Sequence, residues 1–269
     1  MNPEPALLIE RHEAEWFRTM RHVPGVEVHD DPGVVWMVRP WGTSGNAGTH
    51  VRLTARGAPR QLDRMLERYR ANGHGMGMWV APAATPANLD TLLRERGLRC
   101  RKRYPAMLRT LDDVNEKRTR VSGIECMPIG EVDEFRATAY PSIGPLTTVR
   151  RRGSFTALAT LTAVRPVIVR AFVARERGRP VASSLLFLGK ECAGLHDLTV
   201  IESHRGRGIG GALLEHTCAA AVAHGATRMA LISTALGEGV YRRAGFVEVA
   251  RFAHWFRSFK PGSAGSRRR

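Results

Sequence analysis

The stretch that decides the fold is Val200-Ile-Glu-Ser-His-Arg205-Gly-Arg-Gly-Ile-Gly-Gly-Ala-Leu-Leu-Glu215. An apolar, β-branched run from Leu195 to Ile201 precedes it and predicts a strand, and apolar residues at helical spacing follow it. The glycines leave backbone N–H groups uncovered, and the N-terminus of the following helix faces the same place. Nearby arginines add positive charge. The pattern predicts a phosphate or pyrophosphate site formed by Arg205, Gly206, Arg207, Gly208, Ile209, Gly210 and Gly211.

Two better-known phosphate loops fit this stretch less well. A Walker loop needs Lys-Ser/Thr after its last glycine, but Ala212 and Leu213 follow Gly211. A Rossmann loop needs G-x-G-x-x-G spacing and an acidic residue about 20 residues later, and both are missing. A strand-to-helix turn with glycines for packing alone is the remaining alternative.

The order Arg205-x-x-Gly208-x-Gly210 after a strand resembles the coenzyme A pyrophosphate loop of the GNAT superfamily of N-acyltransferases. The resemblance continues downstream, where the sequence predicts a helix over 210–224 and a buried strand over 228–233. It ends in Tyr241-Arg-Arg-Ala-Gly245-Phe246, which is similar to the family's Tyr-x-x-x-Gly-Phe segment. The resemblance implies an α/β fold with a mixed, mainly antiparallel twisted sheet flanked by helices.

The resemblance also implies roles for individual residues. Tyr241 corresponds to the general acid that protonates the departing thiolate. His196 lies four residues before Val200, where the arylalkylamine N-acetyltransferases place a base, and histidine ordinarily titrates near neutrality. Asp197 and bound water are the alternatives for that base. The family's asparagine after the fifth strand is replaced here by Ser233. The implied acyl-CoA contacts are Leu198, Thr199, Val200 and Ser233 together with the glycine loop.

The charge of the chain is unusual. It has 41 Lys/Arg against 25 Asp/Glu, a net charge of +16. Residues 1–115 contribute 17 basic and 13 acidic residues, and the rest contribute 24 and 12. This surplus is larger than one pyrophosphate requires, and it predicts attraction to a polyanion such as tRNA. A basic, GC-rich coding background is the alternative. The basic clusters are 101–103, 117–120, 150–152, 175–179 and 267–269.

The first part of the chain weakly repeats the second. At an offset of 148 residues, Gly97 aligns with Gly245 and Arg109 with Arg257 without a gap. Leu93 then stands where the second part has Tyr241, and residues 52–59 contain a single glycine in place of the loop. We therefore expect two GNAT-like domains: residues 1–115, degenerate and non-catalytic, and residues 116–260, catalytic. A disordered basic tail is expected over 261–269.

Smaller features complete the expectations. Residues 110–123 read as a linker, 130–140 as a helix, 141–152 as a loop near the acceptor, and 167–188 as a hairpin turning at Arg177-Gly178. Trp36, Trp41 and Trp79 are expected to pack in the first core. The four cysteines are scattered, which predicts buried thiols and no metal site. No apolar run is long enough to cross a membrane and no signal segment is visible, so a cytoplasmic protein is expected.

The sequence thus predicts an N-acyltransferase that moves an acyl group, most simply acetyl from acetyl-CoA, to a primary amine of a small molecule. One alternative keeps the fold and takes an aminoacyl group from aminoacyl-tRNA, which suits the basic charge. Another is a nucleic-acid-binding protein without catalysis. The acceptor is not specified by the sequence, and either a monomer or a homodimer is compatible with it.

Overall fold

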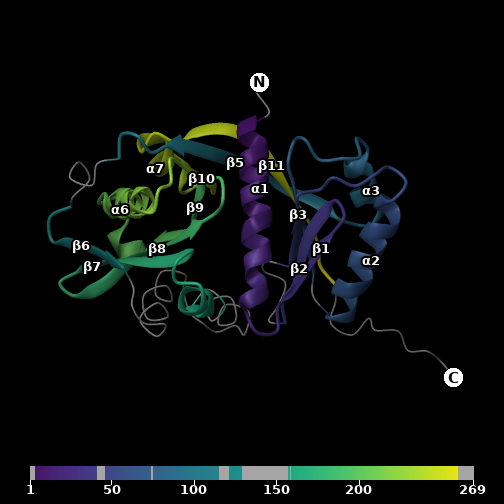
Figure 1. The fold of residues 1–269 in the computed structure, drawn as a ribbon, viewed down its shortest axis with the longest axis horizontal. Coiled ribbons are helices and arrows are strands. Elements are labelled where there is room, and N and C mark those ends of the chain that lie inside the picture. Colours follow the sequence, from purple (N-terminus) through teal and green to yellow (C-terminus); the bar gives the residue numbers. More distant parts are fainter. Residues whose placement is uncertain are drawn as a thin grey trace. The chain divides into compact units, whose positions relative to one another are not determined.

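The computed structural model describes residues 4–40, 46–73, 75–114, 121–128, 157 and 159–259 (Figure 1). The chain forms two compact units, unit 1 with residues 1–104 and 250–269, and unit 2 with residues 105–249. Several predictions concern segments outside the described residues: the helix over 130–140, the loop over 141–152, the tail over 261–269, Trp41, and the basic clusters at 117–120, 150–152 and 267–269.

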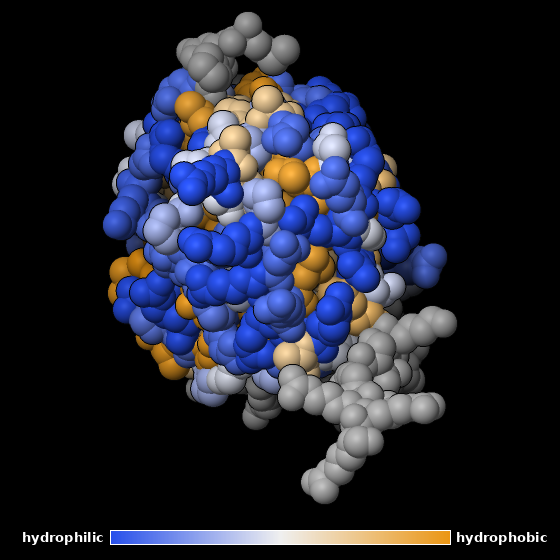
Figure 2. All heavy atoms as spheres, turned by 90° about the vertical axis from the view of Figure 1, so that its right-hand side faces the viewer, coloured by the Kyte–Doolittle hydropathy of each residue, from blue (hydrophilic) through white to orange (hydrophobic). Residues whose placement is uncertain are grey.

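Unit 1 is a mixed sheet with helices packed on it. Its strands follow the order β1-β2-β3-β4-β11, in which only β3 and β4 pair in parallel. Seen from the side of α2 and α3, its surface is mostly hydrophilic (Figure 2). Its elements are α1 (Glu4–Thr19), η1 (Met20–His22), β1 (Glu27–Asp31), β2 (Val34–Val38), β3 (Ala47–Thr49), α2 (Ala58–Ala71), β4 (Met76–Val80), α3 (Leu89–Glu95), the first part of β5 (Arg99–Thr110) and the last part of β11 (Val247–Arg257).

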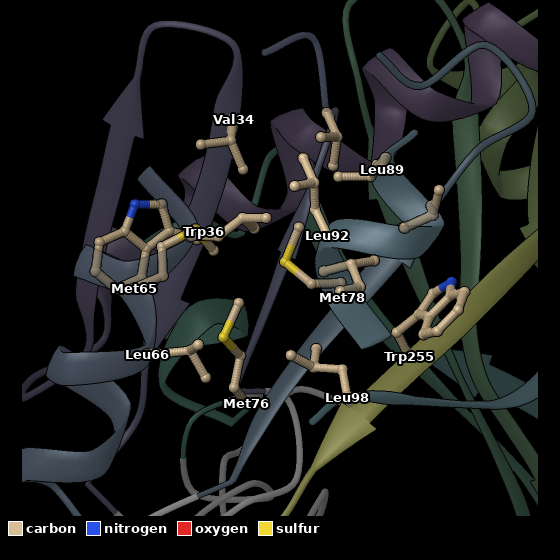
Figure 3. Close-up of a cluster of buried hydrophobic side chains, with 14 of the residues drawn as sticks. Val34, Trp36, Met65, Leu66, Met76, Met78, Leu89, Leu92, Leu98 and Trp255 are labelled. Carbon is tan, nitrogen blue, oxygen red and sulfur yellow. The ribbon is translucent and has the colours of Figure 1, made fainter. Parts of the chain in front are cut away.

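The core of unit 1 lies between the sheet and the helices α2 and α3. Apolar side chains at helical spacing on α2, including Leu62, Met65 and Leu66, are buried against strand residues (Figure 3). Trp36 and Trp255 are both 1% exposed, and the Trp36 indole donates to an Asp31 carboxylate oxygen at 2.7 Å. The prediction that Trp36 packs in this core is confirmed, whereas Trp79 is only partly buried.

Unit 2 is built in the same way. Its sheet follows the order β5-β10-β9-β8-β7-β6, and only β9 and β10 pair in parallel. Apolar residues of α6 such as Leu213, Leu214 and Cys218 pack on this sheet and form its core. Its elements are the last part of β5, β6 (Ile124–Pro128), β7 (Val169–Glu176), β8 (Arg179–Leu188), β9 (Ala193–Val200), η3 (Glu202–His204), α6 (Ile209–Ala223), β10 (Arg228–Ile232), α7 (Glu238–Arg243) and the start of β11.

The predicted hairpin is confirmed. Strands β7 and β8 pair antiparallel and turn at Arg177-Gly178. Both turn residues have positive φ, 50° and 76°, which suits the right-handed twist of the flanking strands. The predicted helix over 210–224 and the predicted strands over 195–201 and 228–233 also agree with α6, β9 and β10 to within one or two residues.

Each unit contains strand residues from both halves of the chain. Residues 106–110 of β5 follow the helices of unit 1, yet they pair antiparallel with β10 of unit 2. Residues 253–257 of β11 follow the helices of unit 2, yet they pair antiparallel with β4 of unit 1. The compact units therefore do not coincide with the sequence repeat at 1–115 and 116–260. The predicted mixed, mainly antiparallel sheet flanked by helices is confirmed.

Two smaller expectations have mixed outcomes. Cys192 and Cys218 are buried as expected, but Cys100 is exposed, because it lies in the one part of β5 that is open on both faces. None of the helices in the described ranges is long and apolar enough to span a bilayer.

Candidate functional site

The candidate site of unit 2 begins where two parallel strands separate. Strands β9 and β10 pair only at Ala193 with Met229 and at Gly194 with Ala230, although both strands are described in full. Beyond these pairs the remainder of β9 continues along β8 alone, up to Ala182 opposite Val200. The gap that opens lies on the β10 side of residues 196–200. Backbone groups in such a gap can hydrogen-bond an extended ligand.

A bulge in β9 shapes this gap. The register against β8 shifts by one residue between Leu185–His196 and Ser183–Thr199, so that β9 has one extra residue here. Asp197 takes up the shift with φ of +50°, a left-handed conformation that is uncommon for residues other than glycine. Because of this bulge, the side chains from His196 to Val200 do not alternate strictly between the two faces of the sheet.

The predicted glycine loop joins the end of β9 to α6. Gly206 and Gly208 have φ of +75° and +80°, and Gly208 is the N-cap of α6. Gly210 approaches the strand closely, since a Cβ there would lie 3.3 Å from Val200 Cγ2. Neither a positive φ nor a close contact requires glycine at position 211. Its φ is not positive, and a Cβ there would meet nothing within 4 Å.

The first amides of α6 are available to a ligand. Within the described residues no backbone acceptor meets the N–H groups of Ile209, Gly210 and Gly211, and the first backbone bond at this end runs from Ala212 N to Gly208 O at 3.0 Å. The helix dipole adds partial positive charge at the same end. Open space beside Gly211 and N–H groups without a backbone acceptor therefore occur together where the sequence predicts an anion site.

The two arginines of the loop have different roles. The Arg205 guanidinium donates to the Val200 carbonyl oxygen at 3.1 Å and ties the loop to the end of β9. Arg207 is paired with Glu176, whose carboxylate also lies 3.1 Å from His204 Nε2. Hydrogen bonding from Arg207 lowers the pKa of Glu176. Because Glu176 neutralises Arg207, the positive potential of the loop comes mainly from its backbone amides and from Arg205.

Tyr241 lies on α7 and is 9% exposed. Burial, with a further contribution from the Asp197 carboxylate, raises the pKa of the Tyr241 phenol to about 12. The phenol therefore carries its proton at neutral pH and can act as an acid. Asp197, which the sequence offers as an alternative to His196 for the base, therefore influences the pKa of Tyr241 through its negative charge.

Gly237 is not among the residues that the sequence predicts for the site, but its missing side chain makes room for Tyr241. A Cβ at Gly237 would lie 2.7 Å from Tyr241 Cε2 and 3.2 Å from its hydroxyl oxygen, so the tyrosine ring takes up the space of the missing side chain. The spacing of four residues between Gly237 and Tyr241, which places them on one helix face, was the available signal.

The structure places His196 on β9 opposite Leu185, directly before the bulge. Its ring is partly buried and tilted against Phe187, with centroids 6.5 Å apart. His196 therefore lies at the point where β9 and β10 separate. Leu198, Thr199 and Val200, the other predicted β9 contacts, are all partly exposed along the same gap.

Ser233 has a structural position. It is fully buried, its hydroxyl donates to the Thr234 carbonyl oxygen at 2.9 Å, and its N–H donates to the Pro105 carbonyl oxygen at 2.8 Å. The hydroxyl is thus engaged within the chain, which leaves it less able to hold a ligand than the sequence suggested. Thr234 in turn accepts the Gly237 N–H and orders the start of α7.

Unit 1 repeats the topology of this site without its opening. Ala47-Gly-Thr49 pairs antiparallel with β2 and, through Ala47 and Gly48, in parallel with β4. Ala193-Gly-Leu195 pairs in the same way with β8 and, through Ala193 and Gly194, with β10. Past His50, however, Thr85 closes the gap: its N–H donates to Val51 O at 3.0 Å, and its carbonyl accepts from Leu53 N at 3.3 Å.

The matching helix of unit 1 offers fewer free amides. The amides of Gly57 and Ala58 at the start of α2 donate to the Thr54 carbonyl oxygen at 3.1 and 2.9 Å. Pro59 follows and has no N–H to offer. Among the first three residues of α2, only Arg60 therefore has an N–H that meets no backbone acceptor in the described chain, whereas all three first residues of α6 have one.

Comparisons with known proteins agree with this geometry. Residues 168–248 match the family model of the acetyltransferase (GNAT) domain. A search of curated proteins finds no match to the chain. Among solved structures, a GCN5-related N-acetyltransferase from Kribbella flavida is 17% identical with a TM-score of 0.70, covering 94% of this chain and 96% of that one.

Two further solved structures are similar over most of this chain. A GCN5-related N-acetyltransferase from Sphaerobacter thermophilus has 19% identity and a TM-score of 0.61, covering 88% of this chain and 77% of that one. A tandem GNAT protein from the clavulanic acid biosynthesis pathway has 15% identity and a TM-score of 0.61, covering 87% and 84%. The fold is therefore that of the GNAT acetyltransferases, and the family match lies on the unit that contains the candidate site.

Proposed function

We propose that unit 2 is an N-acyltransferase that moves an acyl group, most simply acetyl, from acyl-CoA to a primary amine of a small molecule. The observation that carries the proposal is the gap between β9 and β10, which leads directly to the free amides at the start of α6. An extended chain in the gap and a pyrophosphate at the helix N-terminus are the two parts of coenzyme A.

The residues present fit this cosubstrate. The space beside Gly211 is open, and no contact within the described chain requires glycine at this position. A ligand that lies against α6 would account for the glycine. Backbone groups of Leu198, Thr199 and Val200 would bind the pantetheine, and one would polarise the thioester carbonyl. When bound, acyl-CoA supplies an activated carbonyl whose C–S bond is broken.

The chain's own residues would handle the two protons. The amine nitrogen attacks the thioester carbon, a C–N bond forms, and the C–S bond breaks. His196 accepts the proton that the amine loses, directly or through water, and Tyr241 gives its proton to the thiolate. The raised pKa keeps Tyr241 protonated until that moment, and Gly237 leaves room for its ring.

We further propose that unit 1 is a non-catalytic copy. It has Leu93 where unit 2 has Tyr241, at the same distance from Gly97 as Tyr241 from Gly245. The N–H groups of Leu98 and Phe246 both donate to these residues' carbonyl oxygens at 3.0 Å, so the two helix ends correspond. A leucine cannot donate a proton, and the closed gap leaves no path for an extended ligand.

A second candidate keeps the site and changes the donor to aminoacyl-tRNA. The net charge of +16 favours it, because a polyanionic donor needs more positive charge than coenzyme A. The glycine loop would then bind a phosphate near the 3′ end of the RNA, while Tyr241 and His196 keep their roles.

Thiol release tests the first proposal. The purified protein is incubated with acetyl-CoA and a panel of primary amines, and free coenzyme A is measured together with acylated amine by mass spectrometry. The expected result is amine-dependent release that is insensitive to RNase. Acylation seen only with charged tRNA, and abolished by RNase, would support the second candidate, whereas turnover with neither donor contradicts both.

A further inference from the structure

One strongly charged surface remains that the acyl-transfer site does not use. Residues 99–103, Arg-Cys-Arg-Lys-Arg, form the start of β5, and all five are exposed. Side chains alternate between the two faces of a strand, so both faces are open to solvent here. Further along the same strand Ala106, Met107 and Leu108 are buried. We call Arg99, Arg101, Lys102 and Arg103, together with Arg94 on α3, the basic ribbon.

The charge of the basic ribbon is compensated at one end only. Asp90 lies 3.9 Å from Arg103 and 3.7 Å from Arg94. In the described part of the chain, no carboxylate forms an ion pair with Arg99, Arg101 or Lys102. By contrast, arginines 18, 52, 68, 96, 109, 207 and 242 each pair with a carboxylate. The ribbon is therefore a local concentration of unneutralised positive charge.

Aromatic rings accompany these cations. The Arg101 guanidinium lies 5.7 Å from the Phe256 ring centroid, Lys102 Nζ lies 5.2 Å from that of Tyr104, and the Arg94 guanidinium lies 5.2 Å from that of Trp255. A guanidinium held over a ring keeps its N–H edge for a phosphate, and its planar fork matches phosphate oxygens. The rings thus order the cations without neutralising them.

Partly exposed rings continue beside the ribbon. His254, Trp79 and Tyr104 form a cluster of rings: the centroid of Trp79 lies 4.5 Å from His254 and 5.3 Å from Tyr104, and the centroids of His254 and Tyr104 are 6.4 Å apart. Burial, and then the charge of Arg101, lowers the pKa of His254, so this ring is uncharged at neutral pH and stacks as an aromatic. Tyr104, His254 and Phe256 each remain partly exposed. Bases stack on platforms of this kind.

The partly exposed rings favour a single strand over a duplex, and the surroundings do not favour a membrane. Unpaired bases can stack on Tyr104, His254 and Phe256, whereas the bases of a duplex are already stacked and paired. The large exposed apolar residues of the described chain (Met127, Val164, Val167, Val222, Leu236, Val247) all belong to unit 2. The ribbon thus lacks the aliphatic anchors of a membrane surface.

We propose that the basic ribbon of unit 1 binds single-stranded nucleic acid through its phosphates and stacked bases. The ligand chemistry is a phosphodiester chain with unpaired bases, which RNA and DNA share. This proposal goes beyond acyl transfer, because it involves neither the β9–β10 gap nor the glycine loop. Binding should therefore survive Tyr241→Phe and proceed without acyl-CoA.

The test is fluorescence anisotropy with 12-nucleotide oligo(U) and oligo(dT) probes between 50 and 300 mM salt. The variant Arg99→Ala/Arg101→Ala should weaken binding at least tenfold and lower the slope of log affinity against log salt by about 1.4, since each lost phosphate contact removes about 0.7. Arg56→Ala/Arg60→Ala, which removes the same charge from exposed residues at and just before α2, is the matched control and should change both quantities much less.

A second readout uses Cys100, which is exposed between two residues of the ribbon. Saturating oligonucleotide should slow its alkylation by N-ethylmaleimide at least fivefold. Equal loss of affinity in the two double variants would show diffuse attraction and overturn the proposal. So would the absence of binding by either probe at 50 mM salt, or binding only to phosphatidylserine vesicles. A preference between oligo(U) and oligo(dT) identifies the biological strand.

Discussion

At the residue scale, Tyr241 is the most informative side chain, because its protonation can be measured. Tyr241→Phe should lower kcat by about 10- to 1000-fold and leave the affinity for acetyl-CoA unchanged, since the hydroxyl acts on the leaving thiolate only. Steady-state kinetics with a good amine substrate would show this. Unchanged turnover would remove Tyr241 from the mechanism.

The pKa of Tyr241 predicts the alkaline side of the pH profile. Because the folded-state pKa is raised to about 12, the acid stays protonated across the usual assay range. Any fall in kcat between pH 8 and pH 10 should therefore have another origin and should persist in Tyr241→Phe. The stability linked to this pKa shift is fully present below about pH 10, where the phenol is protonated in both the folded and the unfolded chain. It is lost as the pH rises towards 12, because the phenol of the unfolded chain ionises first.

Gly237 offers a matched pair of substitutions on one short helix. Gly237→Ala should displace the Tyr241 ring and lower kcat by about as much as Tyr241→Phe, because its Cβ would lie 2.7 Å from Tyr241 Cε2. Gly239→Ala is the control, since its Cβ would approach only the flexible end of Arg243, at 3.3 Å. Equal activity of the two alanine variants would contradict the steric role of Gly237.

At the scale of the elements, α6 combines a stability effect and a binding effect at one position. Gly211→Ala should stabilise the helix by up to about 1 kcal/mol, because the methyl group meets nothing in the chain. The same change, and more so Gly211→Leu, should raise the KM for acetyl-CoA. Thermal melting and initial rates measured on the same preparations separate the two effects. If Gly211→Leu left the KM for acetyl-CoA unchanged, the ligand would not lie against this position of α6.

A buried ion pair joins β5 to α6 within unit 2. Arg109 and Glu215 are 6% and 7% exposed in their side chains, and the Arg109 guanidinium also reaches Asp113 at 3.2 Å. Glu215→Leu should destabilise the protein by about 3 kcal/mol, because a buried charge loses its partner. The double variant Arg109→Met/Glu215→Leu should recover much of that loss in chemical denaturation. No recovery would show that packing, not charge, dominates here.

The elements were the most predictable part of this molecule. Local signals sufficed for the Arg177-Gly178 hairpin turn, the glycine loop and α6, because turn chemistry and helical spacing act over a few residues. The bulge at Asp197 was not predictable, since its left-handed conformation depends on the register with β8. The bond from Thr85 to Val51 joins residues 34 positions apart, and no local pattern announces it.

At the scale of the whole molecule, the sequence repeat and the compact units differ, and the difference is testable. Because β4 pairs with residues 253–257, a chain that ends at residue 115 lacks the strand next to β4 and lacks Trp255 of its core. Such a fragment should be expressed as an aggregating or molten species without a cooperative melt, whereas the full chain should unfold cooperatively. Circular dichroism melting compares them, and a well-folded 1–115 fragment would contradict the structure.

The repeat alone could not predict that the end of β5 pairs with β10 and the end of β11 pairs with β4. Aligning Arg109 with Arg257 matches β5 with β11, but the strand pairing makes Arg109 correspond to Phe256, one residue away. The alignment also leaves open which of the two strands completes which sheet. Pairing partners are chosen by tertiary packing, which local strand propensity does not specify. The repeat thus predicted the parts of the molecule and not their connections.

The pairing of β4 with the last described strand has a consequence for synthesis on the ribosome. Domains usually fold as units while the rest of the chain is still being made. Here β4 emerges from the ribosome well before its partner residues 253–257, because the whole of unit 2 is made between them. The edge of β4 therefore stays unpaired until unit 2 has been synthesised, which makes the nascent chain a natural client for ribosome-associated chaperones.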